Sequence, residues 1–196
     1  MTKPIVQGGE PKFIWTLDRY HDAIDKGVLT ENDKVELIFG EIVPKMPVGE
    51  PHADVLSDIS DFFYERLGTR YKFRAQSPVT LPNDSEPEPD FAIVVRRKYT
   101  RKTGHPKPED ILLLIEVSDT TPADDRTKKA KMFSLANIKE YWIINIPDRQ
   151  VEVHLQPSAV KEMYRSLTVF EAGSTFESPF CGSVKVDDIL PETEEA

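Results

Sequence analysis

A single carboxylate stands near the end of a strongly apolar run, and a cluster of cations follows it. The run is LLIEVS, in which Glu116 is the only acid, and the cations lie in DRTKK at 125–129. In an extended strand alternate side chains share a face, so Leu114 and Glu116 would point together into a core or a cleft. A buried carboxylate without a partner is costly. Glu116 therefore needs a partner, either a metal ion or a basic side chain.

The segment ADDRTKKAKMFSLAN (123–137) predicts a helix that carries such a basic partner. Its apolar residues gather on one arc: Met132, Phe133 and Ala136. At about 100° per residue, Lys129 falls within that arc, whereas Lys128 lies on its flank and Lys131 points away. Lys129 can therefore meet Glu116 across the short loop between strand and helix. The pair has two interpretations: a structural ion pair that ties strand to helix, or one part of a catalytic site.

A second carboxylate, Asp90, favours the catalytic interpretation. It opens the short apolar segment DFAIVV after the proline-bounded EPEP, although an exposed aspartate is also common at such a place. Two carboxylates can hold a hard divalent cation, Mg²⁺ or Mn²⁺, and the backbone carbonyl of Val117 could add a ligand. The cation and a nearby ammonium would stabilise the charge that develops when water attacks a phosphodiester. We therefore predict one site from Asp90, Glu116 and Lys129, with Asp90, Glu116 and Val117 as metal ligands.

The elements that would position these residues predict a mixed α/β sheet with two principal helices packed on it. Helices are expected over 16–27, 52–68 and 123–137, and a hairpin over 35–46. Strands are expected over 71–81, 90–95, 110–118, 140–146 and 151–155, followed by a further hairpin. Strict alternation in VEVHL indicates one solvent-facing side that carries His154. We predict a single domain over 1–196, with 1–10 and 191–196 frayed.

Composition and charge limit the classes of protein. The chain has 196 residues, of which 39% are hydrophobic, and the lone Cys181 cannot form an internal disulfide. With no long apolar stretch and no signal peptide, we expect a cytoplasmic protein without a membrane span. The net charge of −9 argues against a nucleic-acid coat protein. The segment RRKYTRKTGHPK (96–107) contains no acid. It is either a solvated loop or, together with Arg126 and Lys128, a basic face that binds phosphates. If no such face lies beside Asp90, DNA would be a poor substrate.

The motifs together resemble the PD-(D/E)XK nuclease superfamily and, more closely, the bacterial Uma-two family of restriction-endonuclease-like proteins. The resemblance covers nearly the whole chain in the family's order and rests on these pieces: VELIFGEIV, His52, QSPVTL, EPDFAIV, LLIEVSDTT, DRTKK and NIKEYWIIN. It implies a restriction-endonuclease-like mixed sheet flanked by helices, with an added N-terminal helix and hairpin.

The resemblance also implies roles for individual residues. Asp90 matches the "PD" aspartate and Glu116 the second metal ligand. The superfamily's lysine would fall at Ser118, but in the Uma-two family it has moved onto the following helix, where Lys129 matches. The family's acidic hairpin motif contributes Glu36 or Glu41, of which we favour Glu36. His52 either assists the site or only caps its helix, and the capping role is favoured.

The function implied by this resemblance is that of a Mg²⁺- or Mn²⁺-dependent endonuclease that cuts nucleic acid, DNA in preference to RNA. Nucleases of this fold often dimerise to cut both strands, so a homodimer stays open. One alternative is a catalytically inactive nuclease-like fold that serves as a binding or scaffold module, because fold does not fix function. A hydrolase for smaller phosphate esters ranks last, because the chain has no Walker-type glycine loop.

Overall fold

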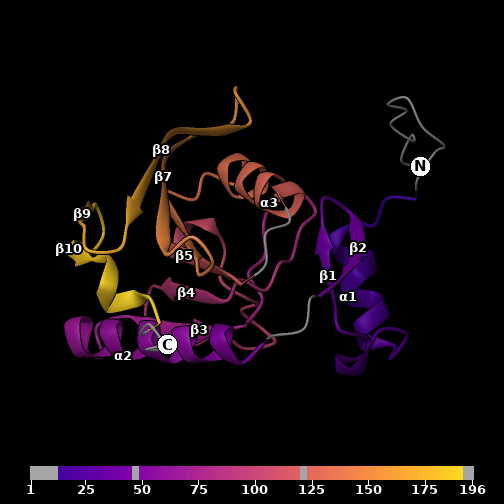
Figure 1. Ribbon diagram of the computed structural model, residues 1–196. Helices are drawn as coiled ribbons and strands as arrows, with labels where there is room; N and C mark the ends of the chain where they lie inside the picture. Colours follow the sequence, from indigo (N-terminus) through magenta and orange to yellow (C-terminus); the bar gives the residue numbers. More distant parts are fainter. Residues whose placement is uncertain (1–12, 46–48, 120–122, 192–196) are drawn as a thin grey trace.

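A six-stranded mixed sheet forms the centre of the protein (Figure 1). The structure, a computed structural model, describes residues 13–45, 49–119 and 123–191. In spatial order the strands are β3 (Lys72–Ala75), β4 (Phe91–Val94), β5 (Ile111–Ser118), β6 (Glu140–Asn145), β7 (Gln150–Ser158) and β8 (Met163–Glu171). All neighbours are antiparallel except β5 and β6. The expected fraying of 1–10 and 191–196 concerns, apart from Pro191, residues outside the described ranges.

Two helices cover opposite faces of the sheet, α2 (Glu50–Leu67) below and α3 (Ala123–Leu135) above in Figure 1. α3 is the crossover that a parallel pair such as β5–β6 requires. α2 begins after Gly49, ends at Gly68, and buries Val55, Ile59 and Phe63 completely. These side chains pack on the β4–β7 part of the sheet. The predicted mixed α/β sheet with two principal helices packed on it is confirmed.

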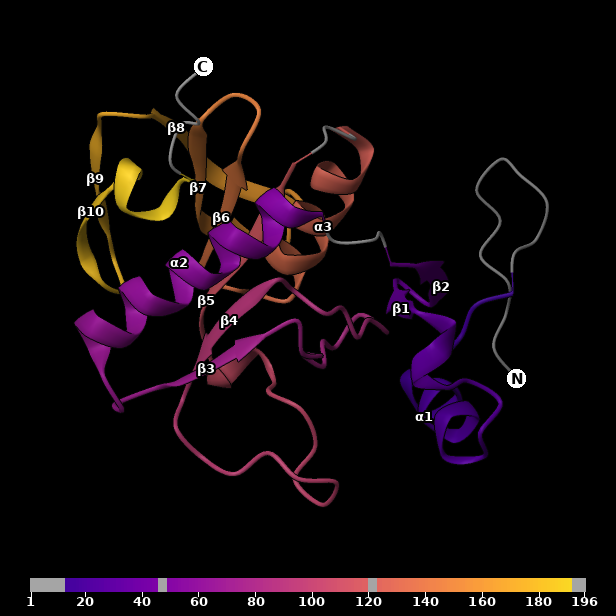
Figure 2. The ribbon, with the colours of Figure 1, turned by 60° about the horizontal axis from the view of Figure 1, so that its bottom comes forward.

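The added N-terminal unit consists of α1 (Leu17–Asp25), the short helix η1 (Glu31–Asp33) and a hairpin of β1 (Val35–Ile38) and β2 (Glu41–Pro44). It lies beside the sheet body in both ribbon views (Figures 1 and 2). Phe39 and Gly40 both have positive φ, 51° and 73°, which makes the two-residue turn that antiparallel strands favour. A Cβ on Gly40 would lie 2.7 Å from the Trp15 carbonyl oxygen, so this tight approach requires glycine. The predicted helix and hairpin are both present.

A C-terminal hairpin, β9 (Thr175–Ser178) and β10 (Gly182–Lys185), joins the core on the α2 side. Phe176 and Val184 are buried there, and η3 (Val186–Ile189) closes the chain against α2. Another short helix, η2 (Pro108–Asp110), leads into β5. Across the described ranges, no helix combines the length and the apolar character needed to cross a membrane.

Two strand predictions are wrong in detail. The strand expected over 71–81 ends at Ala75, and Gln76 follows with a φ of 41°. The side of β7 expected to face solvent is covered by α3, so the His154 side chain is only 9% exposed. Its ring lies 5.2 Å from Tyr141 and 5.5 Å from Tyr164, centroid to centroid. Alternation separates the two faces of a strand, but it does not reveal what packs on each.

Candidate active site

A cleft of about 820 Å³ opens where β4 begins and β5 ends. Its lining comes from the β1–β2 hairpin, the first turn of α2, the segment between β3 and β4, strands β5 and β6, and the N-terminal half of α3. Phe91 of β4 pairs with Ile115 of β5. Because these strands are antiparallel, the residue before Phe91 and the residue after Ile115 lie next to each other. Asp90 and Glu116 therefore meet at the same end of the two strands. The pairing therefore brings together two carboxylates that are 26 positions apart in the chain.

Asp90 is 9% exposed and held in a fixed orientation. Its Oδ2 accepts a hydrogen bond of 2.8 Å from the backbone N–H of Val117. In an extended strand the N–H and C=O of one residue point to the same side, so the Val117 carbonyl also faces Asp90. The carbonyl of the next residue, Ser118, points the other way and accepts from Ile146 N at 2.9 Å. The Val117 carbonyl is therefore directed to the side of the cleft.

Glu116 and Lys129 meet as the helical spacing predicts. The Lys129 Nζ lies 3.1 Å from Glu116 Oε2, and both side chains are largely buried, 14% and 12% exposed. Burial raises the pKa of Glu116 well above its usual value; Lys129 opposes this rise, whereas Asp90 and Glu36 add to it. The second oxygen, Oε1, is buried and has no hydrogen-bond partner among the described residues. One lysine therefore balances only part of the negative charge that is concentrated here.

The hairpin contributes Glu36 rather than Glu41 to this cleft. Glu36 is 7% exposed, lines the cleft, and accepts a hydrogen bond of 3.0 Å at Oε2 from Glu88 N. Glu41 is outside the lining and pairs with Lys128 at 3.4 Å, with about a third of each side chain exposed. The structure thus places the favoured glutamate beside Asp90 and Glu116.

His52 is the residue whose position sequence reasoning misjudged. The favoured role, a helix cap, is wrong: the N-cap of α2 is Gly49, and His52 sits inside the first turn. Its Nε2 lies 2.9 Å from Asp90 Oδ1, and the side chain is 10% exposed. Burial lowers the pKa of His52, but the Asp90 carboxylate outweighs burial and the pKa is raised. His52 therefore holds Asp90 from the side opposite to Val117 N–H.

The donor set fits a hard divalent cation. Within the described ranges, no three acidic, histidine or cysteine side chains converge closely enough to hold a metal by themselves. Mg²⁺ in proteins commonly takes only one or two carboxylates and keeps several waters. Asp90, Glu116 and the Val117 carbonyl provide such a set, and the partnerless Glu116 Oε1 offers an oxygen with no competing bond. A cation would also offset the negative charge of Asp90 and Glu36, which adds to the effect of burial in raising the Glu116 pKa.

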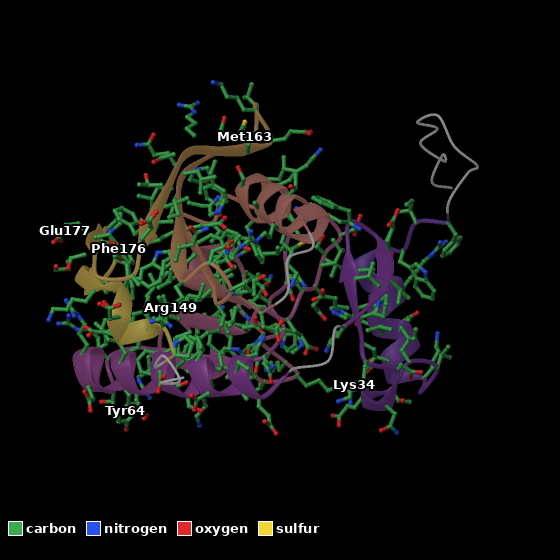
Figure 3. The ribbon with its side chains drawn as sticks, in the orientation of Figure 1. Lys34, Tyr64, Arg149, Met163, Phe176 and Glu177 are labelled. Atoms are coloured by element: carbon green, nitrogen blue, oxygen red, sulfur yellow. The ribbon has the colours of Figure 1, made fainter. Side chains whose placement is uncertain are left out.

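The basic residues of the cleft differ partly from those predicted. Arg126 and Lys128 line it as expected, joined by Lys34 and Lys45 at the two ends of the hairpin. Figure 3 labels Lys34 at the part of the N-terminal unit nearest to α2. The location of Lys34 and Lys45 beside Asp90 depends on how the hairpin packs on the sheet, so no local pattern indicates it.

The segment 96–107 does not line the cleft, which favours the solvated loop over the basic face among the two interpretations of its sequence. Asp90 precedes β4 whereas this segment follows β4, so it leaves the sheet from the other end of the strand. Arg97 pairs with Asp110, Arg101 lies 2.7 Å from Asp25, and Arg96 donates to the Tyr71 carbonyl. These cations thus make contacts within the fold.

The chain is similar to a family model and to solved structures. The model of the Uma2 family, described as "Putative restriction endonuclease", matches residues 17–185. A solved structure from Anabaena variabilis, titled as a putative nuclease belonging to DUF820, has a TM-score of 0.71 with this chain. The match covers 89% of this chain and 97% of that one at 17% identity, which shows a shared fold. No curated protein matches the chain.

Proposed function

The chain belongs to the Uma2 family of putative restriction endonucleases, and we propose that it is a metal-dependent endonuclease that hydrolyses phosphodiester bonds in DNA. The observation that carries this proposal is the pair of buried carboxylates at one edge of the sheet, Asp90 and Glu116, with Lys129 beside them. The preference for DNA over RNA rests on the family's description as restriction endonucleases.

In this proposal Asp90, Glu116 and the Val117 carbonyl hold Mg²⁺ or Mn²⁺. A bound cation of this kind supplies Lewis-acid stabilisation and makes water more acidic. The Val117 N–H and His52 fix the orientation of Asp90, so that one carboxylate is positioned before substrate arrives. Glu36 is an accessory acid at the hairpin side of the cleft.

Lys129 positions the attacking water and offsets negative charge on the phosphate. Its buried amine stands on a helix that packs firmly on the sheet, because Met132 and Phe133 of the same helix are fully buried. A fixed cation in a site with little water is worth more than the same charge in solution. Lys129 on α3 thus takes the role that a lysine on the strand has in the superfamily.

The phosphate backbone would be bound by the basic residues that line the cleft, Lys34, Lys45, Arg126 and Lys128. Clustered cations attract nucleic acid even when a protein carries a net charge of −9. Lys45 and Arg126 pair in the free protein with Glu88 and Glu152 respectively. Phosphate binding would therefore exchange these carboxylates for phosphate oxygens.

A binding or scaffold module is the second candidate function. The observation that favours it is the 3.1 Å contact between Lys129 and Glu116, a largely buried ion pair. In that case the cluster would stabilise the junction of β5 and α3 and would have no catalytic role.

Calorimetric titration with Mg²⁺ and Mn²⁺, followed by incubation with supercoiled plasmid, single-stranded DNA and RNA, tests the proposal. We expect Asp90→Asn to lose both metal binding and cleavage, and Lys129→Met to lose cleavage but keep metal binding. Lys131→Met is the matched control, because Lys131 lies on the same helix but pairs with Glu162 outside the cleft. Absence of metal binding by the wild-type protein, with reduced thermal stability in Lys129→Met, would instead support the scaffold module.

A further inference from the structure

The walls of the cleft stand close together at both ends of the β1–β2 hairpin. At the turn end the hairpin meets α3, where Lys128 Nζ lies 3.4 Å from Glu41 Oε2. At the open end the hairpin meets the segment that leads into β4, where Lys45 pairs with Glu88. A double helix does not fit between walls that approach so closely, because its major groove alone is about 12 Å wide.

The position of the hairpin is fixed by main-chain hydrogen bonds and by apolar packing. Glu86 N donates to Leu37 O at 2.7 Å, and Gly40 N donates to Asp84 O at 2.7 Å. Ile38 belongs to the same buried cluster as the apolar face of α3. Exposed ion pairs by themselves are weak. The width of the cleft is therefore set by the fold and does not depend on the ion pairs at the two ends of the hairpin.

The proposed reaction site is recessed within this cleft. The Asp90, Glu116 and Lys129 side chains are 13%, 12% and 14% exposed. In paired DNA the nucleotides on both sides of a phosphodiester are held in the double helix, and they keep that phosphodiester out of a narrow cleft. Enzymes whose pocket is too deep for paired DNA act on a single strand or turn a nucleotide out of the double helix. The depth of this site favours a substrate of the same kind.

The hairpin wall offers an apolar surface to an unpaired nucleotide. Val43 lies directly opposite Glu36 in the β1–β2 pair, so the two side chains share the face that lines the cleft. Val43 is half-buried, and its neighbour Pro44, which also lines the cleft, is exposed. An unpaired nucleotide exposes the apolar surface of its base, whereas stacking hides that surface in a double helix. The wall therefore suits single-stranded DNA.

We propose that the cleft takes DNA that is single-stranded at the scissile phosphodiester, with one unpaired nucleotide against Val43 and Pro44. This inference rests on the proposed nuclease function and narrows its substrate. The cations of the cleft come from both walls, Lys34 and Lys45 beside the hairpin strands and Arg126 and Lys128 on α3. One strand between the walls presents its phosphates to both, as in proteins that bind single strands in a positively charged groove.

Cleavage of three DNA substrates of one sequence in Mg²⁺ tests this inference: a single strand without self-complementarity, its fully paired duplex, and a duplex with an internal unpaired loop. We expect cleavage of the single strand and of the looped duplex, with the cuts in the latter confined to the loop. The paired duplex should be cut at least about tenfold more slowly, because it must first be opened.

Equal cleavage of the paired duplex would overturn the inference and leave the nuclease function intact. Failure to cleave any of the three substrates would overturn the nuclease function, and the inference with it.

Val43→Ser tests the contact with the unpaired nucleotide by a readout other than cleavage. By fluorescence anisotropy in EDTA, it should weaken binding of the single strand by about threefold or more, because apolar surface is lost. The slope of log K against log salt should stay the same, because no charge is removed.

Val160→Ser is the matched control, because Val160 is 94% exposed in the β7–β8 turn and does not line the cleft. It should bind the single strand as the wild-type protein does, and circular dichroism verifies the fold of both variants. Wild-type affinity in Val43→Ser, or an equal loss in the two variants, would overturn the proposed contact.

Discussion

The two helices that cover the sheet do so with different chemistry. α2 places Val55, Ile59 and Phe63 on its face, and all three are fully buried among apolar residues. The C-terminal half of α3 is similar, but its N-terminal half presents two cations, Lys129 toward Glu116 and Arg126 toward Glu152. One face of the sheet thus serves the core alone, whereas the other divides between core and site.

The sheet itself explains how the charged half of α3 is accommodated. Glu116 pairs in register with Ile143 of β6, which in turn pairs with Glu152 of β7. The two carboxylates therefore lie in one row across three strands, beneath two cations spaced by one helical turn. Several buried polar atoms there have no hydrogen-bond partner in the described part of the chain: Glu116 Oε1, Arg126 Nε and His154 Nε2. Native interiors contain few such atoms, so their concentration indicates a functional site.

The largest effect should follow from removing the buried cation. We expect Lys129→Met to lower the rate of DNA cleavage by about 10²- to 10⁴-fold, the range for loss of a group that acts directly on the reaction. Thermal stability should change little, because the Glu116 carboxyl can take up a proton when its partner is lost. Plasmid nicking and differential scanning calorimetry measure the two quantities. If Lys129→Met cleaved DNA normally but unfolded easily, the N-terminal half of α3 would serve stability, as α2 does, and not the site.

A substitution on the α2 face should show the opposite pattern. Phe63→Ala removes a fully buried ring that stacks near Phe91 and Trp142, and we expect a loss of about 3–5 kcal/mol of unfolding free energy. Tyr64→Ala, its neighbour at 59% exposure, should cost far less. Urea denaturation gives both values. Metal binding by the folded fraction of Phe63→Ala should persist, and its loss would mean that the two faces are coupled.

The raised pKa of Glu116 predicts a pH dependence that belongs to the α3 face. Its pKa in the folded state lies well above 4.5, the value expected for an unfolded glutamate. The protonated carboxyl therefore stabilises the metal-free fold below pH 4.5, and this contribution is lost as the pH rises through the folded-state pKa. Metal-free wild-type protein should thus lose stability relative to Glu116→Gln on going from acid to neutral pH. Parallel curves for the two proteins, measured by urea denaturation, would contradict this.

The smallest effect should distinguish two basic regions. Lys34→Gln at the cleft should reduce DNA affinity slightly and lower the slope of log K against log salt by about one. Arg101→Gln removes an equal charge from the segment 96–107, which lies outside the cleft, and should leave the slope unchanged. Fluorescence anisotropy in EDTA measures both. If Arg101→Gln changed the slope as much as Lys34→Gln, the segment 96–107 would be part of the DNA-binding surface.

Sequence reasoning succeeded where one regular element decides the outcome. The face of Glu116 follows from strand alternation, and the buried side of Lys129 follows from helical spacing. The Phe39–Gly40 turn and the Thr16 cap of α1, whose oxygen accepts from Arg19 N, are equally local. Such features depend on residues a few positions apart, so the sequence contains all the information they need.

The failures concern the packing of one element on another. His52 reaches Asp90 only because α2 crosses the sheet at that edge, and Lys34 reaches the cleft only because the hairpin packs there. His154 is buried because α3 covers its face of β7. The composition of 96–107 shows its charge, but the direction in which the chain leaves β4 decides where that charge lies.

The parallel pairing of β5 with β6 has a consequence for synthesis on the ribosome. Translation produces Asp90 and Glu116 first, Lys129 next, and only then β6 at residues 140–145, which flanks β5. A nascent chain that stops before β6 has both carboxylates but lacks the strand that completes the wall of the cleft. Parallel pairing across a helix also forms late, because its contacts are distant in sequence. In a nuclease, this order would delay activity until translation has passed β6.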